Sequence, residues 1–247
     1  YSCDMAVMAQ NGVYIFSNSG EVTYHVISEN TGALLAPQAQ WVLPSYINYG
    51  DGFIEAIHFA DDRLLLVTEK TAMVMALKTS KVSLTAEEMP IEFEHYTEAG
   101  LTSADFGHSP WSTEKISDNN GMSGLLIVGE ANGNVTGWEW NGTKSDTNQF
   151  SLQEKMKIDG LVDTVKQVQI TDLGNSGYSD LLVSDNENSF WLYSSLLKNR
   201  ATFSVGDDFL QGVFLSNGSE DYYYAVSASS VDSGIIEDNM YTLDGLQ

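Results

Sequence analysis

The sequence predicts an all-β fold made of repeated four-stranded sheets. Apolar residues at helical spacings are scarce, and short runs of β-branched and aromatic residues alternate with turns. Glycine turns lie beside several of these runs, as at Ser19-Gly20 and Asn132-Gly133. One pattern, a hydrophobic strand, a polar turn and a second strand that is often aromatic, recurs five times. A period of about 40 to 60 residues with four strands per unit is typical of a β-propeller, here of about five blades.

The repeats follow one another along the whole chain. Their cores lie near residues 5–27, 64–77, 125–140, 181–194 and 222–241. The clearest predicted strands are, in order, Val13–Ser17, Val22–Ile27, Leu64–Thr68, Ala72–Leu77, Leu125–Val128, Val135–Trp140, Val165–Ile170, Leu181–Ser184, Phe190–Ser194 and Tyr222–Val226. We interpret residues 1–247 as a single propeller domain, or as part of a larger propeller or longer protein. A β-sandwich of irregularly spaced strands is the alternative.

Two stretches interrupt the rhythm of strands. Residues Thr85–Glu98 are rich in acidic side chains, and residues Thr143–Lys157 are mixed in charge. We predict that each is a loop on one face of the fold or a short helix. Propellers carry binding loops on such faces, and a solvated excursion without a partner is the alternative.

Composition excludes several classes of partner. The chain carries 34 acidic and 11 basic side chains, a formal net charge of −23. Nucleic acid and anionic lipid surfaces are bound mainly through Lys and Arg, so neither is an expected partner. No apolar run is long enough for a transmembrane helix, and the single cysteine, Cys3, forms no disulfide within the chain. The chain opens at Tyr1 rather than Met, which suggests that a processed segment or a larger parent has been trimmed away. The strongly acidic surface fits an exported protein that faces salt.

One segment resembles a known kind of blade. Residues Ile170–Val183, with an aspartate-containing loop that ends in Gly-x-x-Asp before an apolar strand, resemble the FG-GAP or VCBS-type repeat. Residues Glu114–Ile127 align with them without a gap and form a weaker copy, with Gly121 where Gly177 stands. The first two repeats are similar to quinoprotein-like blades, in which a strand pair ends in a Thr-Gly turn, here Thr31-Gly32. The resemblance implies a β-propeller.

In proteins of the FG-GAP type, oxygen ligands at alternate loop positions wrap a Ca²⁺ ion. The resemblance implies Asp172, Ser176 and Asp180 as candidate ligands, with Gly174 in a position that calls for an oxygen ligand. The weaker copy offers Asp118 and Asn120 and lacks acidic residues at its ends. Each loop is therefore half of a calcium site. The alternative is that Gly177 and Asp180 simply shape the turn and satisfy backbone donors.

Aromatic pairs form a second group of candidates. Trp138 and Trp140 lie two residues apart on a predicted strand and so point to one face, as do Trp191 and Tyr193 on another. Such faces stack sugar rings in lectins, which makes these four residues candidate ligand-binding residues. Packing between adjacent blades is the alternative role.

Signals for catalysis are thin. Residues Gly107–Trp111 begin like a nucleophile elbow but lack its final glycine, and the four histidines form no zinc motif. Acidic pairs such as Asp61-Asp62 and Asp207-Asp208 could serve a glycosidase only if two carboxylates converged on the central funnel.

The sequence therefore favours a non-catalytic binding, adhesion or protein–protein interaction module of an exported bacterial protein. It would be periplasmic, cell-surface or extracellular, and would recognise a protein or glycan through loops at one end of the propeller. The alternatives are a glycan-binding lectin or glycan-active propeller enzyme, and an assembly scaffold of a secreted or surface machine. Ca²⁺ is the only cofactor that the residues suggest.

Overall fold

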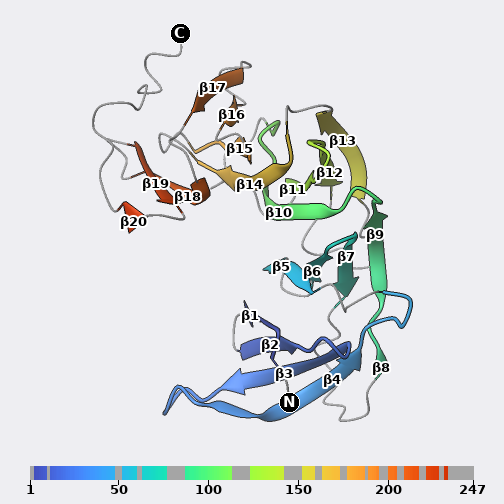
Figure 1. Ribbon diagram of the computed structural model, residues 1–247. Helices are drawn as coiled ribbons and strands as arrows, with labels where there is room; N and C mark the ends of the chain where they lie inside the picture. The colour runs from blue at the N-terminus through green and yellow to red at the C-terminus, as the bar shows by residue number, and fades with distance from the viewer. Residues whose placement is uncertain are drawn as a thin grey trace. The chain divides into compact units, whose positions relative to one another are not determined.

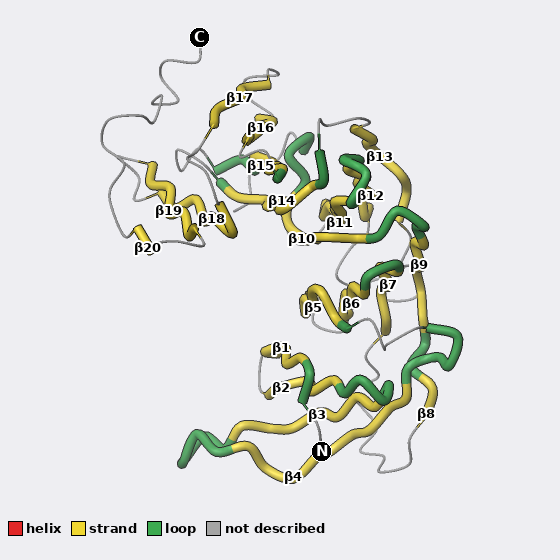
Figure 2. The backbone as a smooth tube through the Cα atoms, viewed as in Figure 1, coloured by secondary structure: helices red, strands yellow, loops and turns green. Residues whose placement is uncertain are grey.

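The computed structural model confirms the all-β fold class (Figure 1). It describes residues 3–9, 12–47, 52–59, 63–76, 87–112, 123–141, 152–158, 163–172, 177–186, 189–194, 200–204, 209–216, 221–227 and 231–232. These residues form strands and loops, with no helix among them (Figure 2). Within this described part of the chain, no helix is therefore long and apolar enough to span a membrane. Two compact units, Tyr1–Leu101 and Thr102–Gln247, divide the chain and are described separately.

Unit 1 contains two sheets. Sheet A runs β1 (Met5–Ala9), β2 (Gly12–Phe16), β3 (Glu21–Ile27) and β4 (Leu34–Val42), each antiparallel to the one before. A short fifth strand, β8 (Glu87–Glu88), pairs in parallel with the end of β4. Sheet B has the order β5 (Phe53–Phe59), β6 (Arg63–Thr68), β7 (Thr71–Ala76) and β9 (Ile91–Tyr96), also antiparallel. The predicted Ser19-Gly20 turn joins β2 to β3, with Gly20 at a φ of 83° that favours glycine.

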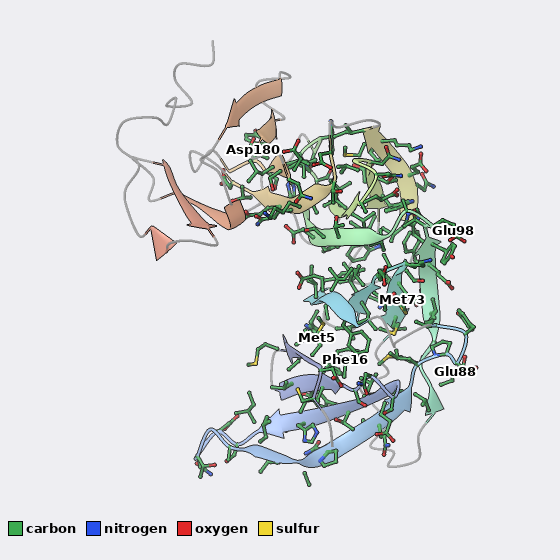
Figure 3. All side chains as sticks on the ribbon, viewed as in Figure 1. Met5, Phe16, Met73, Glu88, Glu98 and Asp180 are labelled. Atoms are coloured by element: carbon green, nitrogen blue, oxygen red, sulfur yellow. The ribbon has the colours of Figure 1, made fainter. Side chains whose placement is uncertain are left out.

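The core of unit 1 lies between these two sheets. Buried side chains of sheet A meet buried side chains of sheet B, and Figure 3 shows Met5, Phe16 and Met73 pointing into this layer. The fully or nearly buried members are Val7, Tyr14, Phe16, Val22, Ala39, Trp41, Leu43, Ile47, Leu64, Leu66, Met73, Met75 and Met89. The ring of Tyr14 stacks on the ring of His58 from β5, with centroids 6.1 Å apart. Burial raises the pKa of the Tyr14 hydroxyl, with a smaller contribution from Tyr24.

Unit 2 contains three sheets built in the same way. Sheet C has the order β10 (Leu101–His108), β11 (Ser123–Glu130), β12 (Val135–Asn141) and β13 (Leu152–Ile158). Sheet D has the order β14 (Val165–Thr171), β15 (Asp180–Asp185), β16 (Ser189–Ser194) and β17 (Arg200–Ser204). The described part of sheet E is β18 (Phe209–Ser216), β19 (Asp221–Ser227) and β20 (Val231–Asp232).

Sheets C and D pack face to face. Their shared core contains the buried residues Leu125, Ile127, Val135, Val165, Val168, Leu181 and Val183. Residues 124–130 of β11 and all of β15 are buried, which explains why the sequences of these central strands contain continuous apolar runs. A sheet that is covered on both faces needs apolar side chains at successive positions, because neighbouring residues point to opposite faces.

The structure corrects how the repeats were divided. The predicted first strands of the last four repeats are the second strands of their sheets, namely β6, β11, β15 and β19. The sheets themselves begin at Met5, Phe53, Leu101, Val165 and Phe209, which are 48, 48, 64 and 44 residues apart. The first repeat is therefore counted from its first strand and the other four from their second, and the true spacing is no more even than that of the predicted repeat cores.

The two interrupting stretches were also assigned incorrectly. Residues Thr85–Glu98 contain β8 and β9, and residues Thr143–Lys157 contain most of β13. No helix occurs in the described parts of either stretch. Both β9 and β13 are the last strands of their sheets, where charged side chains can face water, so their acidic residues do not indicate loops.

Candidate functional site

Two hydrogen bonds show which strand connections of sheets C and D lie at the same end of these sheets. At one end, the ring Nδ1 of His108, the last residue of β10, lies 3.2 Å from the hydroxyl of Ser179, just before β15. At the other end, the Thr164 hydroxyl donates to the Ala131 carbonyl oxygen at 2.8 Å and so ties the start of β14 to the β11–β12 turn. The connections that follow β10 and β14 therefore lie at the same end. We call this end the His108 end.

Side chains of β10 fix β14 beside it. The Val168 amide donates to the Ser103 hydroxyl at 3.1 Å, and the Ile170 amide donates to Asp105 Oδ2 at 2.7 Å. β14 is the first strand of sheet D, so these two amides lie on the edge that β15 does not pair. Ser103 and Asp105 lie two residues apart on β10, as Val168 and Ile170 do on β14. Their side-chain oxygens therefore replace the carbonyl acceptors that a neighbouring strand would otherwise provide.

Asp105 is held in a largely buried position. Its other oxygen, Oδ1, accepts the amide of Phe106 at 2.8 Å. Burial raises the pKa of the Asp105 carboxyl, because the charged form loses its hydration, and the two amide donors lower it by a smaller amount. The link between the sheets thus depends on the Asp105 carboxylate. Its burial is unfavourable, and the two amide hydrogen bonds offset part of that cost.

Two glycines let the sheets approach closely. A side chain on Gly129 of β11 would collide with Val165 of β14, and a Cβ on Gly107 of β10 would lie 2.9 Å from Ile170. Real Cβ atoms do not approach other atoms so closely, so both positions need glycine. Gly107 and the Ser103 and Asp105 bonds set the distance between sheets C and D toward the His108 end, and Gly129 sets it at the opposite end, beside Val165.

A rigid turn presents an aromatic ring at this end. The Ser112 amide donates to the Ser109 carbonyl at 3.0 Å and closes a β-turn, with Pro110 at the position that favours proline. The Trp111 amide lies 3.4 Å from the Ser109 hydroxyl, which itself donates to Glu139 Oε1 at 3.2 Å. Ser109 is 1% exposed, whereas Trp111 is 42% exposed. The buried Ser109 hydroxyl therefore anchors the turn, and the indole of Trp111 is exposed at the surface.

The anchor continues onto the outer strand of sheet C. Glu139 of β12 pairs through Oε2 with Lys155 Nζ of β13 at 3.1 Å. The Lys155 side chain is 44% exposed and the Glu139 side chain is 14% exposed. A carboxylate that bonds a serine and a lysine at once has little freedom to move, so it fixes the turn that carries Trp111.

The second connection at the His108 end is the predicted calcium loop. Asp172 Oδ2 accepts the amide of Gly177 at 3.0 Å, and Gly177 has a φ of 81°. Asp180 is buried at the first position of β15 and is labelled in Figure 3. Among the described residues, no three His, Cys, Asp or Glu side chains gather as ligands of one metal ion would. Ser176, Asp118 and Asn120 lie outside the described residues.

Of the four aromatic residues predicted to bind a ligand, two have described side chains, and both are buried. Trp138 and Trp140 of β12 are 6% and 8% exposed, and the ring of Trp140 lies 6.4 Å from that of Phe106. Both indoles are therefore buried, as the alternative packing role requires. Trp191 and Tyr193 belong to β16, opposite Val183 and Leu181 of β15, and the positions of their side chains lie outside the described residues.

Two features of the site are not apparent from the sequence motifs. Trp111 ends a degenerate nucleophile elbow, and the Ser109-Pro110 turn signal is what places it on a loop. Ser109 is buried with its hydroxyl committed to Glu139, which does not suit a nucleophile. The pairing of Ser103 and Asp105 with β14 spans 65 residues and left no local signal.

Comparison of the chain with protein-family models and with curated proteins finds no match. The resemblance of residues Ile170–Val183 to the FG-GAP type therefore stays a prediction.

Proposed function

We propose that the protein is a non-catalytic recognition module built as a β-propeller, which engages its partner through the His108 end of unit 2. The propeller is supported by the repetition of one sheet design. Sheets A, B, C and D each contain four antiparallel strands, each paired with the next. Successive sheets within each unit are also in contact, as β1 of sheet A is with β5 of sheet B and β14 of sheet D with β18 of sheet E. Stacked four-stranded sheets that follow one another in the chain are the building plan of propeller blades.

The observation that carries the proposed function is the exposed Trp111 on its anchored turn. Tryptophan is enriched among residues that dominate binding energies, and a rigid loop loses little conformational entropy when a partner binds. Ser109, Glu139 and Lys155 hold this turn, and the His108–Ser179 contact sets it beside the Asp172 loop. The described ends of these two connections, which belong to sheets C and D, thus lie close together.

The partner class follows the predictions made from the sequence. We propose a protein or glycan at a cell surface or in a secreted assembly, with the module itself exported. The net charge of −23 disfavours nucleic acid, since phosphate groups would be repelled. Recognition by loops on a fixed scaffold requires no covalent chemistry.

The test is binding of labelled protein to immobilised arrays of purified glycans and of purified cell-surface and secreted proteins. Trp111→Ala is expected to weaken saturable binding by about tenfold or more, while the melting temperature changes by less than about 2 °C. The matched control is Tyr96→Ala in unit 1, because Tyr96 is an aromatic residue that is 54% exposed. Binding that Trp111→Ala leaves unchanged, or no saturable binding on either array, would contradict the proposal.

A further inference from the structure

The turn between β11 and β12 contains an Asn-Gly pair, Asn132-Gly133, at the end of unit 2 opposite the His108 end. Asparagine followed by glycine is prone to lose its side-chain amide, because glycine leaves its own backbone nitrogen unhindered. In that reaction the Gly133 nitrogen gives up its proton and attacks Cγ of Asn132, and ammonia leaves a five-membered imide. Water then opens the imide at one carbonyl or the other, to aspartate or to isoaspartate. The Asn132 side chain is exposed, so water reaches it.

Two hydrogen bonds of the folded turn oppose this attack. The Gly133 amide donates to the Glu130 carbonyl oxygen at 3.1 Å, so the nitrogen that must attack is committed to another partner, and Gly133 is itself buried. Asn132 Oδ1 accepts the Asn134 amide at 3.0 Å, which fixes the side chain that must be attacked. Gly133 has a φ of 82°, a conformation that favours glycine and holds the turn in this shape. Cyclisation therefore requires the turn to open.

Bonds to the rest of unit 2 govern how often the turn opens. The Glu130 amide donates to the Asn134 carbonyl oxygen at 2.9 Å, and the Thr164 hydroxyl, just before β14, donates to the Ala131 carbonyl oxygen at 2.8 Å. Opening of the turn thus strains the link between sheets C and D. We infer that Asn132 is a latent deamidation site. The closed turn keeps it unreactive, and it converts to aspartate or isoaspartate when the turn between β11 and β12 opens.

Isoaspartate at this position would keep the turn from closing again. It routes the backbone through the former side chain, which lengthens the turn by one carbon atom and removes the oxygen that accepts the Asn134 amide. Either product also adds a negative charge close to Glu130, which is 6% exposed. Deamidation at Asn132 therefore loosens sheet C from sheet D at this end.

The experiment ages the full chain at mildly alkaline pH, both folded and in guanidinium chloride, and follows Asn132 by peptide mapping with mass spectrometry. The folded protein is expected to deamidate at Asn132 at least about tenfold more slowly than the unfolded chain. Thr164→Val removes the hydroxyl that holds Ala131 and should raise the folded rate by about fivefold. Thr97→Val in unit 1, where the hydroxyl accepts only a local amide bond to Ala99, is the matched control and should leave the rate unchanged.

A second variant tests the structural consequence. Asn132→Asp keeps an oxygen for the Asn134 amide and cyclises more slowly, because a carboxylate loses its oxygen less readily than an amide loses ammonia. On ageing, the parent should fall in melting temperature relative to Asn132→Asp, since the other Asn-Gly pairs age alike in both. Equal rates in the folded and unfolded chains would overturn the inference, and an unchanged rate in Thr164→Val would overturn the role of the Ala131 bond. Equal loss of melting temperature in the parent and in Asn132→Asp would overturn the loosening of the sheets.

Discussion

At the scale of single residues, Asp105 shows how one carboxylate can hold two sheets together. It accepts the Ile170 amide from the neighbouring sheet at 2.7 Å and the Phe106 amide at 2.8 Å. Asp105→Ala would leave the Ile170 amide without its acceptor, and we expect a loss of about 2 kcal/mol in unfolding free energy, measured by urea denaturation. Asp163→Ala is the control, since Asp163 accepts the next amide, that of Thr164, at 2.7 Å. An equal loss in both variants would contradict a special role for the bond between sheets.

The same carboxyl gives a pH dependence whose sign follows from its raised pKa. Because the folded state binds this proton more tightly than the unfolded chain, its contribution to stability is largest at low pH. The contribution is lost as pH rises from about 4, the ordinary value, through the raised pKa of the folded state, and then stays level. Asp105→Asn lacks the titration, so its stability relative to the parent protein should rise across that window. A difference that is independent of pH would contradict this prediction.

Asp172 allows the calcium hypothesis to be tested separately from the shape of its loop. Its Oδ2 already accepts the Gly177 amide, so Asp172→Ala should lower the unfolding free energy by about 1 kcal/mol even without metal. If the loop also binds Ca²⁺, the parent protein should melt at a higher temperature in Ca²⁺ than in chelator, and Asp172→Ala should lose that difference. The measurement is thermal unfolding at fixed ionic strength. A calcium-dependent shift that survives in Asp172→Ala would place the metal elsewhere.

At the scale of strands, the close approach of sheets C and D depends on glycine. Gly129→Ala introduces a methyl group against Val165, which is fully buried, and should cost about 1 to 3 kcal/mol of unfolding free energy. Val165→Ala alone removes buried methyl groups and should also destabilise. The double variant should cost less than the two single changes added together, because the new methyl group partly fills the space that is lost. Simple additivity in urea denaturation would show that the two positions do not interact.

Central strands could be predicted from the sequence because burial on both faces leaves continuous apolar runs. Leu64–Val67, Leu125–Val128 and Leu181–Val183 were all found in this way. The outer strands β9 and β13 escaped notice because glutamate and lysine occupy their exposed positions and resemble loop sequence.

The first strands β5, β10 and β18 and the site were harder to predict. The half-buried strand β10, with serine and aspartate in its middle, lacks the apolar run that marks a strand. The side chains of Ser103 and Asp105 accept amides that lie 65 residues further along the sequence. Such pairs can be identified only from the folded structure. Exposure of Trp111 likewise depends on the fold, because most tryptophans of a chain this size are expected in the core.

At the scale of the whole molecule, charge is unevenly placed along the chain. All 11 lysines and arginines occur from Arg63 onward, while residues 1–62 carry seven acidic side chains. Repulsion among carboxylates should therefore destabilise the folded state at low ionic strength. Raising NaCl from about 10 mM to about 300 mM should raise the melting temperature at pH 7.

Acid provides the control for this effect of salt. Near pH 4 many carboxylates are protonated, so the rise in melting temperature with NaCl should shrink. A salt effect of equal size at both pH values would mean that ion exclusion or another general effect of salt acts instead of charge screening.

The course of the chain through unit 1 has an evolutionary consequence. After the third strand of sheet B, the chain pairs β8 with β4 of sheet A and then returns as β9 to complete sheet B. The Met89 amide donates to the Val42 carbonyl at 3.0 Å at this crossing. A duplication that copied only the segment Phe53–Tyr96 would carry the β8 segment away from the strand it pairs with. We therefore expect these two sheets to be inherited as a pair, whereas sheet D, which keeps its four strands in unbroken order, could be copied alone.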